Sequence, residues 1–583
     1  MAFKKQNTSQ LLLASHHQPG DVMRKTVAND VIKARAFAGQ YVVFLAWDLI
    51  DWTRVPEGSE LLGFAIERSE FDDTGAIREQ HFLRGIKRFP NGDHDVAPGT
   101  PVSTAEHPIQ AFQWGDYTVK PGIQYAYRIV PMRGTPQHLT PDDKASLAFD
   151  VKTQDEWLGA PSDARRPAHS VHFNRGVAGS QAYARKFGNQ RPDENNPDSE
   201  QMRWLSRNVF EAITGFIACA RDATYRLEGA FYEFHYAPVL QAFRDAVIRG
   251  VSVDLLYEAQ EYKVVNEKTI ADTALADVCT PHRVRSGIRH NKFLVLLQNM
   301  KPVAVMTGST NISAGGIFGH SNVLHIVWDE KVAQAYHDYW TQLKRPDVNT
   351  TILKTFSNKM VSTPPGMPLD GCVTLFSPRD ANDEATLVWY AERYRSVQNV
   401  ACMTFAFGLS TRFEQVLKTD DQAVRYALFD KAIKADVADS IATTTNSVVG
   451  CGAKLAPDDL ECFIGERLTG FNKNAYIHDK FLLCDPLGSN PLVLTGSANF
   501  SSASQQANDE NMLVIPGDTE VADLYFGEFM RIFDHLYTRY VVGRLRKQGN
   551  ADPHAGYLKT TPAAWLTPQR DGRKRVRRLA FLA

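Results

Sequence analysis

The sequence predicts an α/β protein in which two similar halves follow an all-β sandwich, and three observations carry this prediction. Short β-branched and aromatic stretches, separated by Gly, Pro and Asp, fill residues 36–150 and are typical of a sandwich. Residues 231–258 then read as strand, helix and buried strand, which is a βαβ unit. Finally, residues 290–311 recur as residues 478–499, which indicates an internal duplication.

Changes in composition suggest the domain boundaries. The stretch before the second half is rich in Pro, Ser and Thr and is expected to be a crossover linker. Six basic residues within 570–578 indicate a solvated, basic C-terminal tail, with a phosphate-seeking arm or a cap of the second half as alternatives. The expected N-terminal arm, sandwich, first half, linker, second half and tail are residues 1–35, 36–150, 151–345, 346–370, 371–545 and 546–583.

The composition is that of an ordinary globular protein. The formal net charge of -1 gives no global field that would draw the chain to DNA or to an anionic membrane. No apolar run approaches the roughly 18 residues of a transmembrane helix or forms a signal-peptide core. The seven cysteines are scattered, as expected of reduced thiols. We therefore expect a cytoplasmic protein, while export by a route without a signal peptide stays open.

The duplicated segments carry the same polar residues in one register. In each copy His-x-Lys is followed by Gly-Ser-x-Asn, whose Gly lies eighteen residues after the His. The motif spacing is identical in the two copies without any gap, so chance is a poor explanation. The paired residues, each 188 positions apart, are His290 and His478, Lys292 and Lys480, Ser309 and Ser497, and Asn311 and Asn499.

These residue types favour phosphoryl chemistry. Each half offers an imidazole, an ammonium, a hydroxyl and an amide, because His and Lys two positions apart share one face of a strand. Facing one another, the two sets form a cage of cations and donors that suits the charge of a phosphoryl group during substitution. The cage lacks the oxygen ligands that Mg²⁺ and Ca²⁺ prefer, and the sequence has no zinc spacing. We therefore expect phosphoryl transfer without a metal or another cofactor.

The two motifs resemble those of the phospholipase D superfamily, whose signature is HxKxxxxD followed by GSxN. The second copy matches it fully, with Asp485 at the Asp position and Glu510 further on. The first copy departs from it, with Leu297 and Asn322 at these places. The resemblance covers about residues 200–545 and implies two α-β-α halves with the active site between them. Asp485 and Asn322 are expected to give structural support.

A second resemblance concerns the sandwich. The stretch WGDYTVKPGIQYAYRIVP, residues 114–131, is similar to the late strands of a fibronectin type III domain. Such a module implies a spacer or a docking surface for a partner protein, and the spacer is the favoured interpretation.

The superfamily resemblance also implies roles for the two imidazoles. One His attacks phosphorus to form a covalent phosphohistidine, and the other protonates the leaving oxygen and then activates water. Glu510 is expected to stabilise a charged His478, while His290 is expected to face the neutral Asn322. We therefore predict His290 as the nucleophile and His478 as the general acid. Histidines 235 and 320 are expected to be satisfied or surface residues, and Asp509 a turn residue.

Three functions are compatible with these motifs. The first is hydrolysis of a phospholipid by a phospholipase D type of enzyme, and transfer to an alcohol would use the same residues. The second is a nuclease or a DNA-end phosphodiesterase, which the basic tail and a resemblance to tyrosyl-DNA phosphodiesterases favour. The third is a non-catalytic phosphate-binding adaptor. Because one chain carries both motifs, a monomer is expected to suffice for activity.

Overall fold

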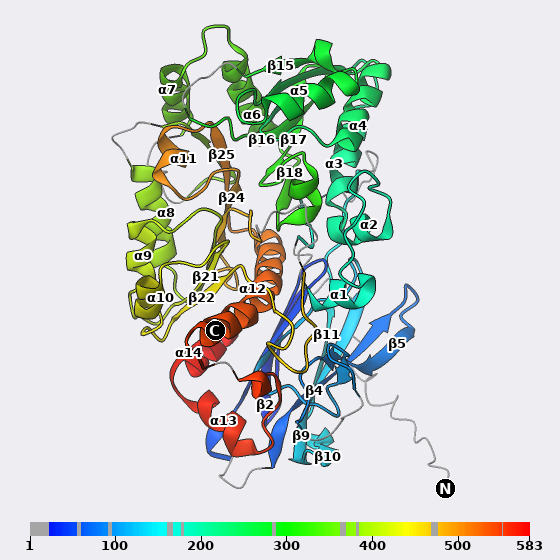
Figure 1. Cartoon of the computed structure of the whole chain (residues 1–583), viewed down its shortest axis with the longest axis vertical. Helices are drawn as coiled ribbons and strands as arrows, with labels where there is room; N and C mark the ends of the chain where they lie inside the picture. Colours follow the sequence, from blue (N-terminus) through cyan, green and yellow to red (C-terminus); the bar gives the residue numbers. More distant parts are fainter. Residues whose placement is uncertain are drawn as a thin grey trace.

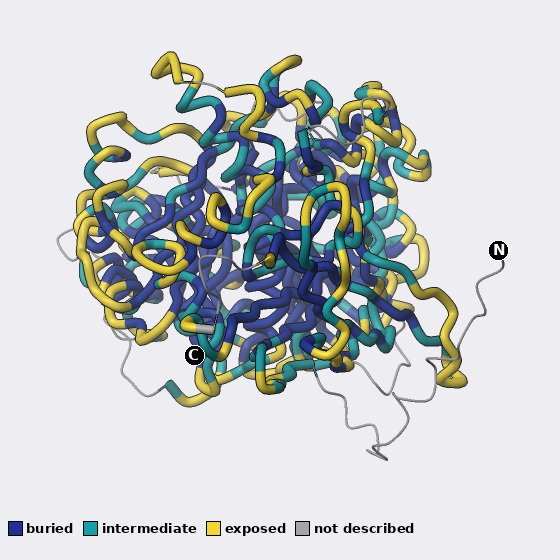
Figure 2. Tube along the Cα trace, turned by 90° about the horizontal axis from the view of Figure 1, so that it is seen from below, coloured by how far each residue is buried: buried dark blue, intermediate teal, exposed yellow. Residues whose placement is uncertain are grey.

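The fold is described by a computed structural model and combines a β-sandwich with two mixed sheets and their helices (Figure 1). The structure describes residues 23–54, 60–90, 96–159, 167–176, 180–282, 287–361, 369–379, 384–467, 476–550 and 552–583. Buried segments concentrate in the middle of the molecule, and exposed ones lie at its periphery (Figure 2).

The N-terminal domain is a sandwich of two antiparallel sheets that share one core. One sheet has the order β1-β2-β3-β8 and the other β10-β9-β4-β5, with β11 also on β9. The first sheet is formed by β1 (Arg24–Ala28), β2 (Ile32–Ala38), β3 (Val43–Leu49) and β8 (Gln113–Asp116). The second contains β4 (Leu61–Phe71), β5 (Ile77–Phe82), β9 (Gln124–Thr135), β10 (His138–Pro141) and β11 (Leu147–Lys152).

The sandwich begins earlier than the sequence analysis places it. Strand β1 and the first part of β2 fall within the expected N-terminal arm, of which residues 1–22 lie outside the described residues. The alternation of β2, with Ile32, Ala34 and Ala36 buried, already marks a strand with one buried face. The relation of this domain to fibronectin type III stays a prediction.

The first half holds a seven-stranded sheet with the order β12-β18-β17-β16-β13-β14-β15. Its strands are β12 (His169–Phe173), β13 (Tyr225–Phe231), β14 (Ser252–Tyr257), β15 (Cys279–Pro281), β16 (Lys292–Gln298), β17 (Lys301–Gly308) and β18 (Val323–Val327). The helices are α1 (Gln181–Phe187), α2 (Glu200–Ser206), α3 (Val209–Ala218), α4 (Ala237–Ile248), α5 (Lys263–Asp272) and α6 (Glu330–Lys344).

The second half repeats this topology with the order β19-β25-β24-β23-β20-β21-β22. The strands are β19 (Val373–Ser377), β20 (Val400–Phe405), β21 (Val424–Phe429), β22 (Ser447–Cys451), β23 (Phe481–Cys484), β24 (Leu492–Gly496) and β25 (Glu510–Pro516). The helices are α8 (Ala385–Arg395), α9 (Thr411–Leu417), α10 (Ala435–Ile441), α11 (Ser502–Gln506) and α12 (Thr519–Lys547). Corresponding strand pairs are parallel or antiparallel alike, so the duplication extends well beyond the motifs.

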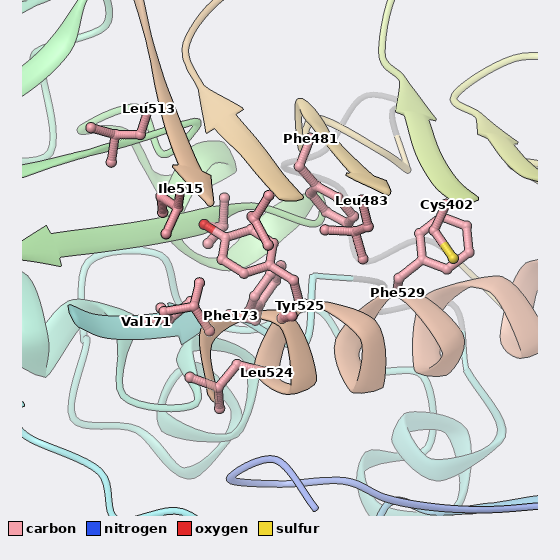
Figure 3. Close-up of a cluster of buried hydrophobic side chains, with 14 of the residues drawn as sticks. Val171, Phe173, Cys402, Phe481, Leu483, Leu513, Ile515, Leu524, Tyr525 and Phe529 are labelled. Atoms are coloured by element: carbon pink, nitrogen blue, oxygen red, sulfur yellow. The ribbon is translucent and has the colours of Figure 1, made fainter. Parts of the chain in front are cut away.

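Helices α6 and α12 join the halves, because each packs on its own sheet and also on the first strand of the other. Along β16, Phe293 and Val295 belong to the core that both halves share, whereas Leu294 and Leu296 face the outer helices of the first half. Figure 3 shows part of the shared core, where Phe173 of β12 and Phe481 of β23 lie beside Tyr525 of α12. This continuous apolar packing holds the two sheets in a fixed relation.

The sandwich packs directly on the second half. The ring centroid of Phe44 in β3 lies 5.3 Å from the ring centroid of Phe526 in α12 and 5.1 Å from that of Phe581. Arg24 Nε donates to the Asp523 carboxylate at 2.8 Å. One face of the sandwich is therefore occupied within the chain, and partner docking through the remaining surface stays a prediction.

The C-terminal residues are folded, which corrects the expectation of a solvated tail. They form helices α13 (Pro562–Arg570) and α14 (Gly572–Leu582). Arg578 is buried, with its Nε 2.8 Å from Asp48 Oδ1 and its guanidinium 4.4 Å from the ring centroid of Trp52. The apolar residues among the charges, including Phe581, face the sandwich and the second half, so α14 packs as an amphipathic helix.

The expected linker also contains regular structure. Helix α7 spans Thr350–Met360, and its Asn349 cap accepts a hydrogen bond from Ile352 N. Residues 362–368 of that range lie outside the described residues. None of the helices in the described ranges is long and apolar enough to cross a membrane.

Candidate active site

The two motif histidines meet where the halves touch. Just before β16, His290 N donates to Asp509 O of the second half at 3.1 Å. Just before β23, His478 N donates to Ser321 O of the first half at 3.0 Å. These reciprocal backbone bonds bring the imidazole rings to a centroid separation of 6.3 Å. The structure thus brings the two duplicated motifs into one site.

Each imidazole is oriented by a residue from the opposite half. His290 Nδ1 lies 3.0 Å from Glu510 Oε2, and His478 Nδ1 lies 2.9 Å from Asn322 Oδ1. The expectation that Glu510 supports His478 is therefore wrong. The backbone of residue 509 pairs with residue 289 across the interface, so the first side chain of β25 reaches the other motif. Asn508 Nδ2 donates to Glu510 Oε1 at 2.8 Å and holds the carboxylate in place.

The two lysines place buried cations beside the imidazoles. Lys292 Nζ donates to His290 O at 2.7 Å, and Lys480 Nζ donates to His478 O at 2.6 Å. Burial lowers the pKa of Lys292 to about 7, against the opposing charges of Glu510 and Glu233. Burial, reinforced by Lys292, lowers the pKa of Lys480 well below its usual value. A bound anion would offset this cost, so the site suits a negatively charged ligand.

The motif serines connect the turns to the next strands. Ser309 Oγ accepts from Val323 N at 3.0 Å and donates to Asn322 Oδ1 at 2.8 Å. Ser497 Oγ accepts from Asn511 N at 3.0 Å. Through Asn322, Ser309 therefore contacts the group that orients His478, whereas Ser497 contacts the backbone at the start of β25.

The motif asparagines differ in their partners. Asn311 Nδ2 donates to Glu233 Oε1 at 2.8 Å. The side-chain oxygens of Asn311 and Asn499 are both buried and have no hydrogen-bond partner among the described residues. A carboxylate therefore holds the nitrogen of the first amide, and both amide oxygens keep hydrogen-bonding capacity.

Asp485 lies at the far end of β23 from His478. Its carboxylate accepts from the backbone N–H groups of residues 398, 399 and 400 at 2.8, 2.7 and 3.2 Å. This anchors the loop before β20, which is the kind of support that the sequence analysis expects. Leu297 occupies the matching place in the first half and is fully buried in the shared core.

Two aromatic groups outside the motifs line the histidines: Tyr232, which sequence reasoning missed, and His320, for which the expectation of a satisfied or surface residue is wrong. The ring of His320 lies 4.9 Å from that of His478, and the ring of Tyr232 lies 5.0 Å from that of His290. Neither ring nitrogen of His320 has a hydrogen-bond partner among the described residues. The position of Tyr232 directly after β13 was the available signal, because residues at strand ends often reach a site.

The site is asymmetric at a pair of matching positions. Gly229 pairs with Leu294 and Met403 with Leu482, so β13 and β20 correspond at a spacing of 174 residues. Glu233 therefore matches Phe407, whose side chain is 63% exposed and lies 6.3 Å from the His478 ring. The first half places a carboxylate at the rim of the site, and the second half places an apolar ring there.

Burial keeps the histidines of this region neutral. It lowers the pKa of His290 to about 4, with Lys292 acting in the same direction and Glu510 opposing it. It lowers the pKa of His320 and His282 to about 3 and that of His478 well below its usual value. The Nδ1 atoms of His290 and His478 each face a hydrogen-bond acceptor, so each neutral ring carries its proton on Nδ1. The Nε2 atom of each ring is therefore unprotonated.

The free energy of unfolding is expected to fall when the pH drops below 6.5. Between pH 6.5 and about 4, His282, His290 and His320 become protonated in the unfolded chain but stay neutral in the folded protein. Each group then contributes up to about 1.4 kcal/mol per pH unit. Urea unfolding at pH 7, 6 and 5 measures the slope. The His320→Asn variant should show a shallower slope, and equal slopes in the two proteins would contradict this account.

The described residues hold no group of three or more His, Cys, Asp or Glu side chains arranged to bind a metal ion. The groups that converge on the site are imidazoles, ammonium groups and amides, with the carboxylate of Glu510 bonded to His290 and that of Glu233 bonded to Asn311. This donor set fits a phosphate better than a hard cation.

The fold and the site together define the class: a duplicated α/β protein with a paired His-Lys site between its halves. A sequence model of the family described as "Cardiolipin synthase, PLD-like domain" matches residues 216–344 and 459–533. The matched ranges contain His290 with strands β16 and β17, and His478 with strands β23 and β24. Both halves of the chain are therefore similar in sequence to this phospholipase D-like family.

Several solved structures are similar in fold. Phosphatidylserine synthase of Haemophilus influenzae Rd KW20 is 13% identical, with 58% of this chain and 90% of that one covered and a TM-score of 0.40. Polyphosphate kinase of Porphyromonas gingivalis is 9% identical, with 88% and 83% covered and a TM-score of 0.38. Yeast tyrosyl-DNA phosphodiesterase is 11% identical, with 50% and 83% covered and a TM-score of 0.31. No curated protein sequence matches the chain significantly.

Proposed function

We propose that the protein is a metal-independent phosphodiesterase that works through a phosphohistidine on His290. The observation that carries this proposal is the pair of imidazoles 6.3 Å apart, one of them bonded to the Glu510 carboxylate. Such a pair can supply a nucleophile on one side of a phosphorus atom and an acid on the other.

The reaction proceeds in two displacements. His290 Nε2 attacks phosphorus, the N–P bond forms, and the bond to the leaving oxygen breaks while His478 Nε2 gives that oxygen a proton. Water then attacks phosphorus, His478 takes a proton from it, and the N–P bond breaks to release a phosphomonoester. Lys292 and Lys480 offset the charge on the phosphoryl oxygens in both steps.

The hydrogen bond between Glu510 and His290 favours His290 as the nucleophile. The sequence led to the same assignment by placing Glu510 beside His478. A phosphohistidine that keeps its Nδ1 proton is a cation, and the Glu510 carboxylate 3.0 Å away stabilises it. His478 is bonded only to neutral groups, the Asn322 side chain and the carbonyl of Ser309. The negative charge of a bound phosphate favours the protonated form of His478. Because burial lowers the pKa of this imidazole, the protonated ring is a strong proton donor.

A phospholipid is the leading substrate. The exposed ring of Phe407 at the rim, beside Lys480 and His478, gives an apolar surface next to the phosphate-binding groups. An acyl or glyceryl group can pack there while the phosphate lies between the imidazoles. A nuclease is the second candidate, but the basic residues that favoured it belong partly to packed helix α14, in which Arg578 is buried.

Product analysis on three substrates tests this proposal. Mixed phospholipid vesicles, supercoiled plasmid and single-stranded DNA are each incubated with the wild-type protein and with the His290→Ala variant, with and without EDTA. Phosphatidic acid release that needs His290 and survives EDTA is the expected result. The exposed His138→Ala variant is the matched control. DNA cleavage alone would establish the second candidate, loss of activity with EDTA would end the metal-free mechanism, and no turnover of any substrate would support a binding adaptor.

The Glu510→Gln variant is expected to lose about 10²- to 10³-fold in kcat. Gln keeps the shape and an acceptor for His290 Nδ1, but it removes the charge that stabilises the phosphohistidine cation. Steady-state kinetics with a soluble phosphodiester measure the effect. The surface variant Glu330→Gln serves as the control, because Glu330 is exposed and its ion pair with Lys301 lies on the surface. Unchanged kcat in Glu510→Gln would remove the carboxylate from the mechanism.

A further inference from the structure

A cavity lies in the second half, apart from the imidazole site. It has a volume of about 310 Å³ and forms where α10, edge strand β22, the C-terminal part of α12 and α14 meet. None of the residues that line it belongs to either His-Lys motif. Ligand pockets in proteins usually begin at about this size.

One wall of the cavity is cationic. Arg544 of α12 and Arg573 and Arg577 of α14 line it, and none of the described lining residues is Asp or Glu. Arg573 and Arg577 lie four positions apart, so they project from the same face of α14. Three guanidinium groups in one wall make a strong attraction for an anion.

The three arginines are satisfied to different degrees. Arg544 forms an ion pair with Asp439, and Arg573 donates to the carbonyl groups of Ala442 and Thr444. Arg577 packs against the Tyr537 ring, with 5.9 Å from its guanidinium carbon to the ring centroid. Its Nε is buried and has no hydrogen-bond partner among the described residues. Arg577 therefore packs on a ring and forms no ion pair among the described residues, so its guanidinium keeps the capacity to bind an anion.

Most of the remaining lining is apolar. Ile441 of α10, Val448 and Val449 of β22 and Leu545 of α12 line the cavity with the rings of Tyr537 and Tyr540, and Ser447 and Gln548 are the other polar residues. The aliphatic side chains and the ring faces can cover a hydrocarbon or aryl group. The cavity therefore has a charged end and an apolar body.

We propose that this cavity binds an amphiphilic anion, whose carboxylate or phosphate contacts Arg573 and Arg577 and whose apolar body packs between β22 and α12. Both head groups share the bidentate oxygen pattern that guanidinium groups recognise. A free fatty acid and a lipid phosphomonoester are the two sources of such an anion. The site differs from the proposed active site in its residues, so it can be tested by binding alone.

Calorimetric titration of the full chain tests the proposal with four probes: decanoate, decyl phosphate, inorganic phosphate and decanol. Decanoate is the primary probe, because it lacks the phosphoryl group that the imidazole site would recognise. At least tenfold tighter binding of decanoate than of decanol is expected, with no heat from inorganic phosphate at this site. Comparing decanoate with decyl phosphate distinguishes a fatty acid from a phosphomonoester.

Variants locate the binding. Arg577→Gln is expected to weaken decanoate binding at least tenfold, whereas Arg575→Gln, on an exposed position of the same helix, should leave it unchanged. Ala438→Phe, which fills the cavity from α10, should abolish binding without removing an arginine. Equal binding by wild type, Arg577→Gln and Ala438→Phe would overturn the proposal, as would equal affinity for decanoate and decanol.

Discussion

Replacing His290 by Asn is expected to abolish the covalent intermediate and to lower turnover by about 10⁴-fold or more. Asn can still donate to Glu510, so the network around the carboxylate is retained, but the nucleophilic Nε2 is gone. Acid-labile phosphate should be trapped on residue 290 of the wild-type protein when a labelled phosphodiester is quenched early. The variant should carry none.

Two outcomes would contradict this assignment. Label on residue 478 in the wild-type protein would reverse the roles of the imidazoles, and label that persists in His290→Asn would place the nucleophile elsewhere. The His138→Asn variant controls for the loss of an imidazole as such, because His138 is exposed on the sandwich. Urea unfolding of both variants shows whether a loss of activity reflects a loss of folding.

Replacing His478 by Asn is expected to slow each step by about 10²- to 10⁴-fold for substrates with an alkyl leaving group. The reason is that an alkoxide needs a proton as it leaves, and His478 is the proposed donor. A nitrophenyl ester needs no such proton. With that substrate the variant should form the phosphohistidine at nearly the normal rate and then stall, because water activation also needs His478.

Rapid-mix kinetics distinguish these steps. His478→Asn should release one equivalent of nitrophenol in a burst, followed by slow turnover, and labelled phosphate should accumulate on His290. The wild-type protein should show a smaller burst with the same substrate. If the variant loses the burst entirely with the nitrophenyl ester, His478 takes part in more than proton transfer. The neighbouring His320→Asn variant tests whether the second imidazole, 4.9 Å away, substitutes for it.

Much of the fold followed from patterns that are local in sequence. The equal spacing of the motif pairs predicted a duplication, and the two sheets have the same strand order and directions. The short sandwich strands were also recognisable, although the expected arm took in β1 and the first part of β2. Helix α14 was missed because its charges were read without the apolar positions between them, of which Phe581 is almost fully buried.

The site shows where local patterns end. The residue types and the meeting of the motifs could be inferred, but the partner of each imidazole depends on which half supplies the neighbouring backbone. Glu510 lies only 32 residues after His478 in the chain and yet bonds to His290, 220 residues away. Tyr232 and His320 carry no motif, and although Tyr232 follows a strand, the folded arrangement is needed to place both rings beside the imidazoles.

The crossed partners give meaning to having both motifs in one polypeptide. Two identical subunits related by a twofold axis would surround their histidines with identical groups. The two histidines could then differ in role only through the direction in which a ligand happened to bind. Fusion of the copies removes that constraint, since position 510 can hold an acid while its counterpart, position 322, holds an amide. The sequence can therefore encode different surroundings for two otherwise equivalent histidines. A substrate then needs to bind in only one direction.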